Sequence, residues 1–474
     1  MAYTYAENLK KKITSGSGNK VVYEKTIAGT SVSENPVPEN TAADRENPFL
    51  VLADPYTGRR IGISKESLSL GLLALASAGG GKTNLFCMIM DTLLENMEEQ
   101  DVLIVFDTKG DYYRAFADRI PEKNKVVMGT GAEYAAVTSY PNLFAEVMPK
   151  GKDGHFVYMP EVEENVREIA GQMFSQLQSE TQPVFPEMAK QIAEVLMIYM
   201  IRMYWKTNPL KLNNKELSDL VKRTTAEDIQ RILELDHMAD YRSCISYVSA
   251  KGGRMGQGVM AYVSTAMRRL LTGAFAKADP DREFSMREII TGQEKKVVFI
   301  EYDLIRGESL APMYGIELDQ GLKYALGGRN TERKNVYVLL DEYILLPKME
   351  YIARCLSFGR SQNVKIMAGV QNIKALENIY GEAEAKNLLS GFQNVFAFKM
   401  ADHDTRQYVM ERMGTNYKDI SYSSQGENIH IQRQAYTVEE WELQKLGLCR
   451  GRAVIELAGE RPFLFQIPRY EGMF

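Results

Sequence analysis

A glycine-rich stretch that ends in a lysine and a hydroxyl, Ser77-Ala-Gly-Gly-Gly-Lys-Thr83, has the residue types that hold a nucleoside triphosphate. Its three consecutive glycines allow positive φ and a close approach of main-chain N–H groups to phosphate, at the start of a helix whose dipole favours an anion. Lys82 adds a positive charge for the β and γ phosphates, and Thr83 offers a hydroxyl to Mg²⁺. We therefore expect ATP to contact Ser77, Ala78, Gly79, Gly80, Gly81, Lys82, Thr83 and Asn84.

This stretch is one residue short of the phosphate-loop pattern G-x-x-x-x-G-K-[ST], because Ala76 stands at the first position. Its surroundings match the pattern, since an apolar run over 70–76 precedes the loop and a helical run over 83–97 follows it. The alternative is a glycine-rich turn before an ordinary helix. The order of strand, loop and helix favours the phosphate site.

Carboxylates that could complete the chemistry follow three apolar runs, at 102–107, 297–301 and 336–342. The last run ends in two adjacent acids, Asp341 and Glu342, which sets it apart. We expect Asp341 to hold the Mg²⁺ shell, and Glu342 to orient and deprotonate the attacking water. Each single acid has an alternative role as a cap or turn residue.

Two further polar residues lie near another buried-strand candidate, 364–370. Gln371 follows this run and could sense the γ-phosphate or the attacking water, or be a satisfied loop amide. Arg360 precedes it and could reach the nucleotide of a neighbouring subunit, or be a surface charge.

Composition limits the class of protein. The chain has 474 residues, enough for two or three compact units, with 45% hydrophobic and 25% charged residues, as in soluble globular proteins. The net charge of −5 gives no overall positive field, so any contact with DNA must be local. Four scattered cysteines without a CxxC pair, and four histidines, support neither a zinc site nor a disulfide framework and favour a reducing cytoplasm.

Targeting segments are not recognised in the sequence. The first residues lack the basic and apolar regions of a secretory signal. The most apolar helical run, 188–205, contains Lys190, Glu194 and Arg202, so we expect a buried helix and no membrane span.

The elements that must position these residues follow an α/β pattern. Expected strands are 21–27, 70–76, 102–107, 125–128, 156–159, 296–302, 336–340, 364–370, 395–399, 429–436, 453–457 and 463–467. Long helical patterns at 166–177, 188–204 and 257–271 interrupt them. We predict a polar N-terminal arm (1–48), two halves of a nucleotide-binding domain (49–160 and 291–474, the second with a β-rich tail) and an inserted all-α domain (161–290).

The order of these motifs resembles the type IV secretion coupling proteins, TraG/TraD-like ATPases of the HerA–FtsK superfamily of P-loop NTPases. Beyond the phosphate loop, 105–112 resembles the family's Asp-Pro-Lys-Gly-Glu segment and 339–343 its Walker B strand. Residues 358–360, 369–371 and 376–381 resemble the segment that runs through its sensor glutamine, and 394–414 the following strand, acidic loop and helix.

The resemblance implies a RecA-like core with a mostly parallel central sheet, interrupted by the all-α domain and assembled as a homo-hexamer around a pore. It implies an ATPase that uses ATP and Mg²⁺ to move single- or double-stranded DNA, alone or with a relaxase or other cargo protein, toward components of a secretion channel. Arg254, Arg268 and Arg269 are candidates for a pore surface, with solvated helix charges as the alternative. The family's usual N-terminal transmembrane anchor is not recognised in this sequence.

Three hypotheses remain open. The first is a DNA-translocating coupling protein of a conjugative element. The second is a HerA-like translocase or helicase in DNA processing or defence, and the third a nucleotide-switched platform that recruits cargo. The expected location is the cytoplasm, with peripheral attachment at the inner face of the cell membrane as an alternative.

Overall fold

The computed structural model describes residues 20–32, 48–151, 153–174, 184–249, 254–327, 334–424, 427–446 and 451–473. The chain divides into two compact units. Unit 1 comprises Met1–Asn96, Leu339–Ile344 and Lys365–Phe474, and unit 2 comprises Met97–Val338 and Leu345–Val364. Strand β10 (Val336–Leu340) therefore starts in unit 2 and ends in unit 1.

The central sheet is α/β in character and mostly parallel, as the sequence predicts. In unit 1 its strands have the order β16-β15-β12-β4-β11, followed by the carboxyl end of β10. Strands β11 and β12 pair in parallel with β4, whereas β15 and β16 add an antiparallel edge. The bounds are β4 (Leu72–Leu75), β11 (Val364–Val370), β12 (Asn394–Ala397), β15 (Arg452–Glu456) and β16 (Phe463–Gln466).

The three inner strands β4, β11 and β12 are buried along their whole length. Strands covered on both faces read as continuous apolar runs, which is why the sequence pattern finds them. Within the described residues, unit 1 has the helices α3 (Lys65–Leu68), α4 (Lys82–Asn96), α16 (Ile373–Tyr380), α17 (Glu382–Ser390), α18 (His403–Met413) and α19 (Glu440–Lys445).

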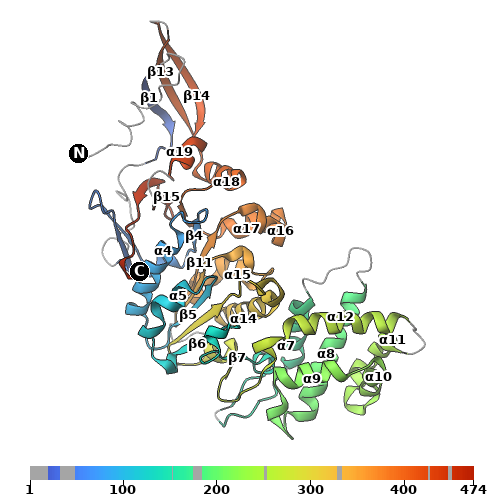
Figure 1. The fold of residues 1–474 in the computed structure, drawn as a ribbon. Coiled ribbons are helices and arrows are strands. Elements are labelled where there is room, and N and C mark those ends of the chain that lie inside the picture. Colours follow the sequence, from blue (N-terminus) through green and yellow to red (C-terminus); the bar gives the residue numbers. More distant parts are fainter. Residues whose placement is uncertain are drawn as a thin grey trace. The chain divides into compact units, whose positions relative to one another are not determined.

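Unit 1 also contains two smaller antiparallel sheets. One is the hairpin β2 (Leu50–Ala53) and β3 (Arg60–Ile63). The other joins β1 (Lys20–Gly29), β13 (Thr415–Ser424) and β14 (Glu427–Tyr436) into a ribbon (Figure 1). The expected strand at 21–27 is therefore confirmed and is tied to the C-terminal part of the chain.

In unit 2 the sheet strands have the order β10-β5-β9-β6, and β5 and β6 pair in parallel with β9. Its strands are β5 (Val102–Asp107), β6 (Lys125–Met128), β9 (Lys296–Glu301) and the short parallel pair β7 (Tyr140–Pro141) and β8 (Glu283–Phe284). Its core helices are α5 (Asp111–Phe116), α6 (Leu143–Val147), α13 (Met286–Thr291), α14 (Gly307–Gly327) and α15 (Tyr351–Phe358).

The described part of unit 2 from 162 to 270 contains helices, turns and 3₁₀ segments, and Figure 1 shows its helices grouped together. They are α7 (Val162–Phe174), α8 (Val184–Tyr204), α9 (Asn214–Arg223), α10 (Ala226–Glu234), α11 (Ile245–Val248) and α12 (Arg254–Leu270). Two of these helices begin with a side-chain cap: Asn213 caps α9, and Thr225 forms a capping box with Asp228 on α10. The three helical patterns expected here are confirmed as α7, α8 and α12.

One expected strand is wrong. Residues 156–159 form no strand; Phe156 makes an isolated bridge with Lys150, and the Val157 side chain is exposed. Its apolar residues do not alternate over a long enough run to pair, and they precede α7 as an irregular connection. Across the described ranges, no helix combines the length and apolarity needed to span a bilayer.

Candidate functional site

The phosphate loop of unit 1 has the geometry that its glycines permit. Strand β4 ends at Leu75 and helix α4 begins at Lys82, so the loop joins a strand directly to a helix. Gly79 has a φ of 72° and Gly81 a φ of 124°, both in the region that side chains disfavour. The loop and the first turn of α4 therefore present main-chain N–H groups where an anion can bind.

Close packing holds the loop in this shape. Ser77 N–H donates to Lys399 O at 2.9 Å, and Gly80 N–H donates to Ser77 O at 2.9 Å. A Cβ at Gly81 would come within 3.1 Å of the Phe398 ring. The segment after β12 thus packs against the loop from one side.

Ala76, the departure from the phosphate-loop pattern, is accounted for by the same packing. It is completely buried, and its N–H donates to Val370 O at 3.2 Å. A Cβ at Gly80 would lie 3.1 Å from the Ala76 Cβ, so a methyl group fits at position 76 as long as position 80 is glycine. The substitution does not disturb the loop.

Three side chains from distant parts of unit 1 converge beside the loop. Lys82 Nζ and Glu342 Oε2 lie 2.6 Å apart, and both side chains are 8% exposed. Gln371 Nε2 donates to the same Glu342 oxygen at 2.6 Å. Strand β10 supplies Glu342 and strand β11 supplies Gln371, because both residues follow the carboxyl ends of neighbouring parallel strands. The structure therefore brings together the lysine, the acid and the glutamine that the sequence singles out.

The other oxygen of this carboxylate is notable. Glu342 Oε1 is buried and has no hydrogen-bond partner among the described residues. A buried acceptor without a partner is costly unless something binds there. An ordered water or a ligand group at this oxygen would remove that cost.

Gly369 in β11 makes room for the lysine, and sequence reasoning did not single it out for this role. A Cβ at this position would lie 2.4 Å from Lys82 Cδ and 2.2 Å from Asp341 O. The available signal was a glycine inside a buried strand, which often marks a close approach by another chain segment.

Thr83 and Asp341 are the predicted Mg²⁺ residues. Thr83 is the second residue of α4 and is half-buried, and Asp341 follows β10 with 4% exposure. A hydroxyl and a carboxylate are oxygen ligands of the kind that Mg²⁺ prefers. Within the described ranges no group of three or more His, Cys, Asp or Glu side chains could hold a metal. This is compatible with Mg²⁺, which usually takes one or two carboxylates together with water and substrate phosphates.

The side chain of Asn84 holds the C-terminal segment. Its Nδ2 donates to Pro468 O at 2.7 Å, and its Oδ1 accepts from Tyr470 N–H at 2.7 Å. The side chain fastens the C-terminal segment to the start of α4. Any contact of Asn84 with a nucleotide therefore falls to its main-chain N–H group. The sequence contained no local signal for this link.

Ser77 and Ala78 complete the expected loop. Ser77 Oγ accepts from Ala401 N–H at 2.8 Å, so this hydroxyl holds the segment after β12, while Ala78 is exposed.

Arg360 lies in unit 2, in the 3₁₀ segment Gly359–Gln362, and is exposed. Arg268 and Arg269 are exposed on α12. The side chain of Arg254 lies outside the described residues.

The two single acids have local roles in unit 2. Asp107 accepts from the N–H groups of Tyr112 at 2.8 Å and Tyr113 at 3.1 Å, so it caps α5. Glu301 is buried and accepts from the Tyr134 hydroxyl at 2.6 Å. Burial, with the nearby charge of Asp107, raises the pKa of Glu301 to about 9. The cap alternative is confirmed for Asp107.

Comparison with known proteins gives one family and several similar folds. The family model described as "Type IV secretion-system coupling protein DNA-binding domain" matches residues 56–440. No curated protein matches the sequence.

Among solved structures, the bacterial conjugative coupling protein TrwBdeltaN70 in its unbound monoclinic form is similar with a TM-score of 0.73. It has 16% sequence identity, with 97% of each chain covered. The plasmid coupling protein TrwB in complex with ADP and Mg²⁺ gives a TM-score of 0.70 at 15% identity, covering 94% of this chain and 95% of that one. VirB4 of Thermoanaerobacter pseudethanolicus is less similar, with a TM-score of 0.54 and 12% identity over 90% of this chain and 98% of that one.

These solved structures support the fold, whereas the family match extends over more than half of the chain. The chain therefore belongs to the family of the type IV secretion-system coupling protein DNA-binding domain.

Proposed function

We propose that the protein is an ATP-hydrolysing motor that moves DNA as a coupling protein of a type IV secretion or conjugation system. The observation that carries this proposal is the convergence of Lys82, Glu342 and Gln371 beside a glycine-rich strand–loop–helix. If Lys82 and Glu342 formed a purely structural ion pair, no glycine-rich loop would be needed beside them. Such a pair would also not require a buried carboxylate oxygen, Glu342 Oε1, that lacks a partner in the described residues.

Each residue has a role that its position supports. Main-chain N–H groups from Gly79 to Thr83 bind the phosphates, and Lys82 leaves Glu342 to neutralise the β and γ phosphate oxygens. Thr83 and Asp341 would hold Mg²⁺, which would neutralise the charge that develops on the transferred phosphoryl group.

Release from Lys82 prepares Glu342 for catalysis. Without the lysine on Oε2, the carboxylate orients a water and accepts its proton, while Gln371 keeps the carboxylate in place from the neighbouring strand. The Lys82–Glu342 pair is then the resting arrangement, which prevents Glu342 from acting as a base before a triphosphate arrives.

Several partners are part of the proposal. The family's description as a DNA-binding domain supports DNA as the transported polymer. We propose a homo-hexamer in which Arg360 reaches a neighbour's nucleotide, a relaxase or other cargo protein, and docking at channel components on the cytoplasmic side of a membrane. The exposure of Arg360 supports the role in a neighbouring subunit.

The proposed domain division remains the one predicted from the sequence. The all-α domain (161–290) interrupts the nucleotide-binding halves (49–160 and 291–474) after the N-terminal arm (1–48). The run of helices α7 to α12 supports the position of the insert.

ATP turnover by the purified chain, with and without single- and double-stranded DNA, tests the proposal. We expect turnover that rises with DNA and that Lys82→Ala reduces to background. If the parent chain and Lys82→Ala show the same rate under all conditions, the motor proposal is refuted.

A further inference from the structure

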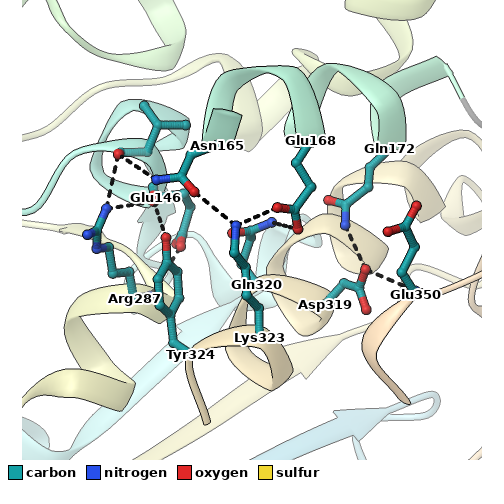
Figure 2. A network of polar contacts seen from close by, with 11 residues as sticks. Glu146, Asn165, Glu168, Gln172, Arg287, Asp319, Gln320, Lys323, Tyr324 and Glu350 are labelled. Carbon is teal, nitrogen blue, oxygen red and sulfur yellow. Dashed lines mark hydrogen bonds and ion pairs between the residues drawn. The ribbon is translucent and has the colours of Figure 1, made fainter. Parts of the chain in front are cut away.

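A polar face of α7 packs against α14 inside unit 2. Asn165, Glu168 and Gln172 follow one another at spacings of three and four residues, so they share one side of α7. Figure 2 shows them above a row of polar side chains on α14. Lys323 Nζ bonds Asn165 at 3.0 Å and Glu168 at 2.5 Å.

The last contact of this row involves a third helix. Gln172 Nε2 donates to Asp319 Oδ2 at 2.6 Å. The same carboxylate accepts from Glu350 N–H at 3.1 Å and from Tyr351 N–H at 2.9 Å, at the start of α15. Asp319 is 1% exposed, so these bonds lie in the protein interior.

Asp319 supplies a cap that α15 does not make for itself. The N-cap residue of α15, Glu350, forms no side-chain capping bond. The first N–H groups of a helix lack partners within the helix, so an acceptor from another element fixes where the helix begins. One carboxylate on α14 therefore connects the start of α15 with the first helix of the all-α region.

Glu168 adds a second link between α7 and α15. Burial, followed by the charge of Glu168 and its hydrogen bond, raises the pKa of the Tyr351 hydroxyl. The start of α15 thus meets α7 both through Tyr351 and through Asp319.

The place of α15 in the chain gives this contact a consequence for the reaction. The segment 343–363 starts directly after the acid pair Asp341 and Glu342, and β11 then leads to Gln371. A helix whose start is fixed limits the movement of the short 3₁₀ turn Tyr343–Leu345 before it and of Arg360 after it.

We propose that Gln172 and Asp319 are positioning residues that couple the all-α region to the segment carrying the catalytic acid, so that DNA contact on the helices changes ATP turnover. The coupling rests on the proposed function. Gln172 and Asp319 belong to unit 2, whereas Lys82, Glu342 and Gln371 belong to unit 1, so we assign the first two a positioning role and not a catalytic one.

Two variants cut the connection from opposite sides. Gln172→Met keeps the length of the side chain and removes its bond to Asp319. Asp319→Asn keeps one acceptor oxygen but replaces the other with a donor that cannot accept an N–H group from α15.

Asn165→Leu is the matched control. It lies on the same face of the same helix, and its buried amide bonds Val147 O at 3.2 Å and Lys323, without a bond to α15 in the described residues. Each variant is assayed at the same number of degrees below its own melting temperature. A change in the coupling between the helices and ATP turnover can then be distinguished from a loss of stability.

The first measurement is ATP turnover with and without DNA. We expect Gln172→Met and Asp319→Asn to lower the stimulation by DNA by roughly threefold or more, equal to a coupling loss of about 0.6 kcal/mol, with the DNA-free kcat within about twofold of the parent. Asn165→Leu should keep the stimulation. If Asn165→Leu and Gln172→Met lost the stimulation by DNA equally, the effect would come from packing between α7 and α14 in general. That result would overturn the proposal.

The second measurement does not depend on ATPase activity. Amide hydrogen exchange at Glu350 and Tyr351 should become at least about tenfold faster in Asp319→Asn and remain unchanged in Asn165→Leu. Unchanged exchange at Glu350 and Tyr351 in Asp319→Asn overturns the proposal. If the exchange changes as expected but the parent chain shows no ATP turnover, the motor function is refuted instead. Should Gln172→Met not fold, Gln172→Ala takes its place in both measurements.

Discussion

Gly369→Ala is the smallest change that should disable the nucleotide site. The added Cβ would lie 2.2 Å from Asp341 O and 2.4 Å from Lys82 Cδ. Ordinary van der Waals contact of a Cβ begins at about 3.4 Å, so roughly 1 Å of movement is needed between β11 and the end of β10, with a cost of about 1–3 kcal/mol. Lys82 can swing aside, but the Asp341 carbonyl belongs to a buried strand end and cannot move without displacing Glu342.

The assay compares the affinity for a fluorescent ATP analogue and the thermal stability of Gly369→Ala with those of the parent. We expect affinity to fall by at least about tenfold, since tenfold corresponds to about 1.4 kcal/mol. The control is Gly171→Ala on α7, where an added Cβ has nothing within 4 Å and helix propensity favours alanine. Parent-like affinity and turnover in Gly369→Ala would refute the reasoning about the space around Lys82.

Three further predictions follow from individual contacts. Glu342→Gln should bind ATP and lose about 10²–10⁴-fold in turnover, because an amide cannot accept the proton of water; equal turnover in a single-turnover assay would contradict this. Glu301→Gln should make the free energy of unfolding less dependent on pH. The pKa of Glu301 in the folded state is about 9, above the ordinary value of 4.5. The protonated carboxyl therefore contributes its full stability below pH 4.5, and this contribution is lost as the pH rises toward 9. In urea unfolding the parent should lose up to about 3 kcal/mol more than the variant between pH 6 and pH 8, at about 1.4 kcal/mol per pH unit, and parallel losses would count against a buried acid. Asn84→Ala removes both side-chain bonds to the C-terminal segment, at a cost of about 1–3 kcal/mol of stability. Limited proteolysis near Tyr470 should therefore become faster, and an unchanged cleavage rate would argue against the link.

The parts of the fold that were predicted correctly have strong local patterns. Strands β5, β6, β10 and β11 agree with the sequence expectation at both ends, because each is a short apolar run within a parallel sheet. The periodicity predicts the helices α7, α8 and α12, with starts placed three or four residues late. The family and the fold class inferred from the motif order are confirmed.

Contacts between distant residues could not be predicted in this way. Asn84 and Pro468 are separated by 384 positions, and no local pattern indicates their hydrogen bond. The cap of α15 by Asp319 is equally remote, since the acceptor lies on another helix. Asp107 and Asp341 both follow apolar runs in the sequence, and only the structure shows that Asp107 accepts from the start of α5.

The phosphate-loop residues and the acid pair were predicted because their chemistry requires fixed residue types at fixed spacing. Their convergence at Glu342 depends on the order of β4, β11 and β10 in the sheet, which the sequence pattern does not specify. The roles of the phosphate-loop residues, Asp341, Glu342, Arg360 and Gln371 in nucleotide binding and catalysis remain predictions.

A crystal structure with Mg²⁺ and a non-hydrolysable ATP analogue tests the central claim most directly. We predict triphosphate against the N–H groups of Gly79 to Thr83, Lys82 Nζ moved from Glu342 to the phosphates, and a water at Glu342 Oε1. A bound analogue with its phosphates away from the loop, and with the 2.6 Å pair of Lys82 and Glu342 intact, would contradict the account.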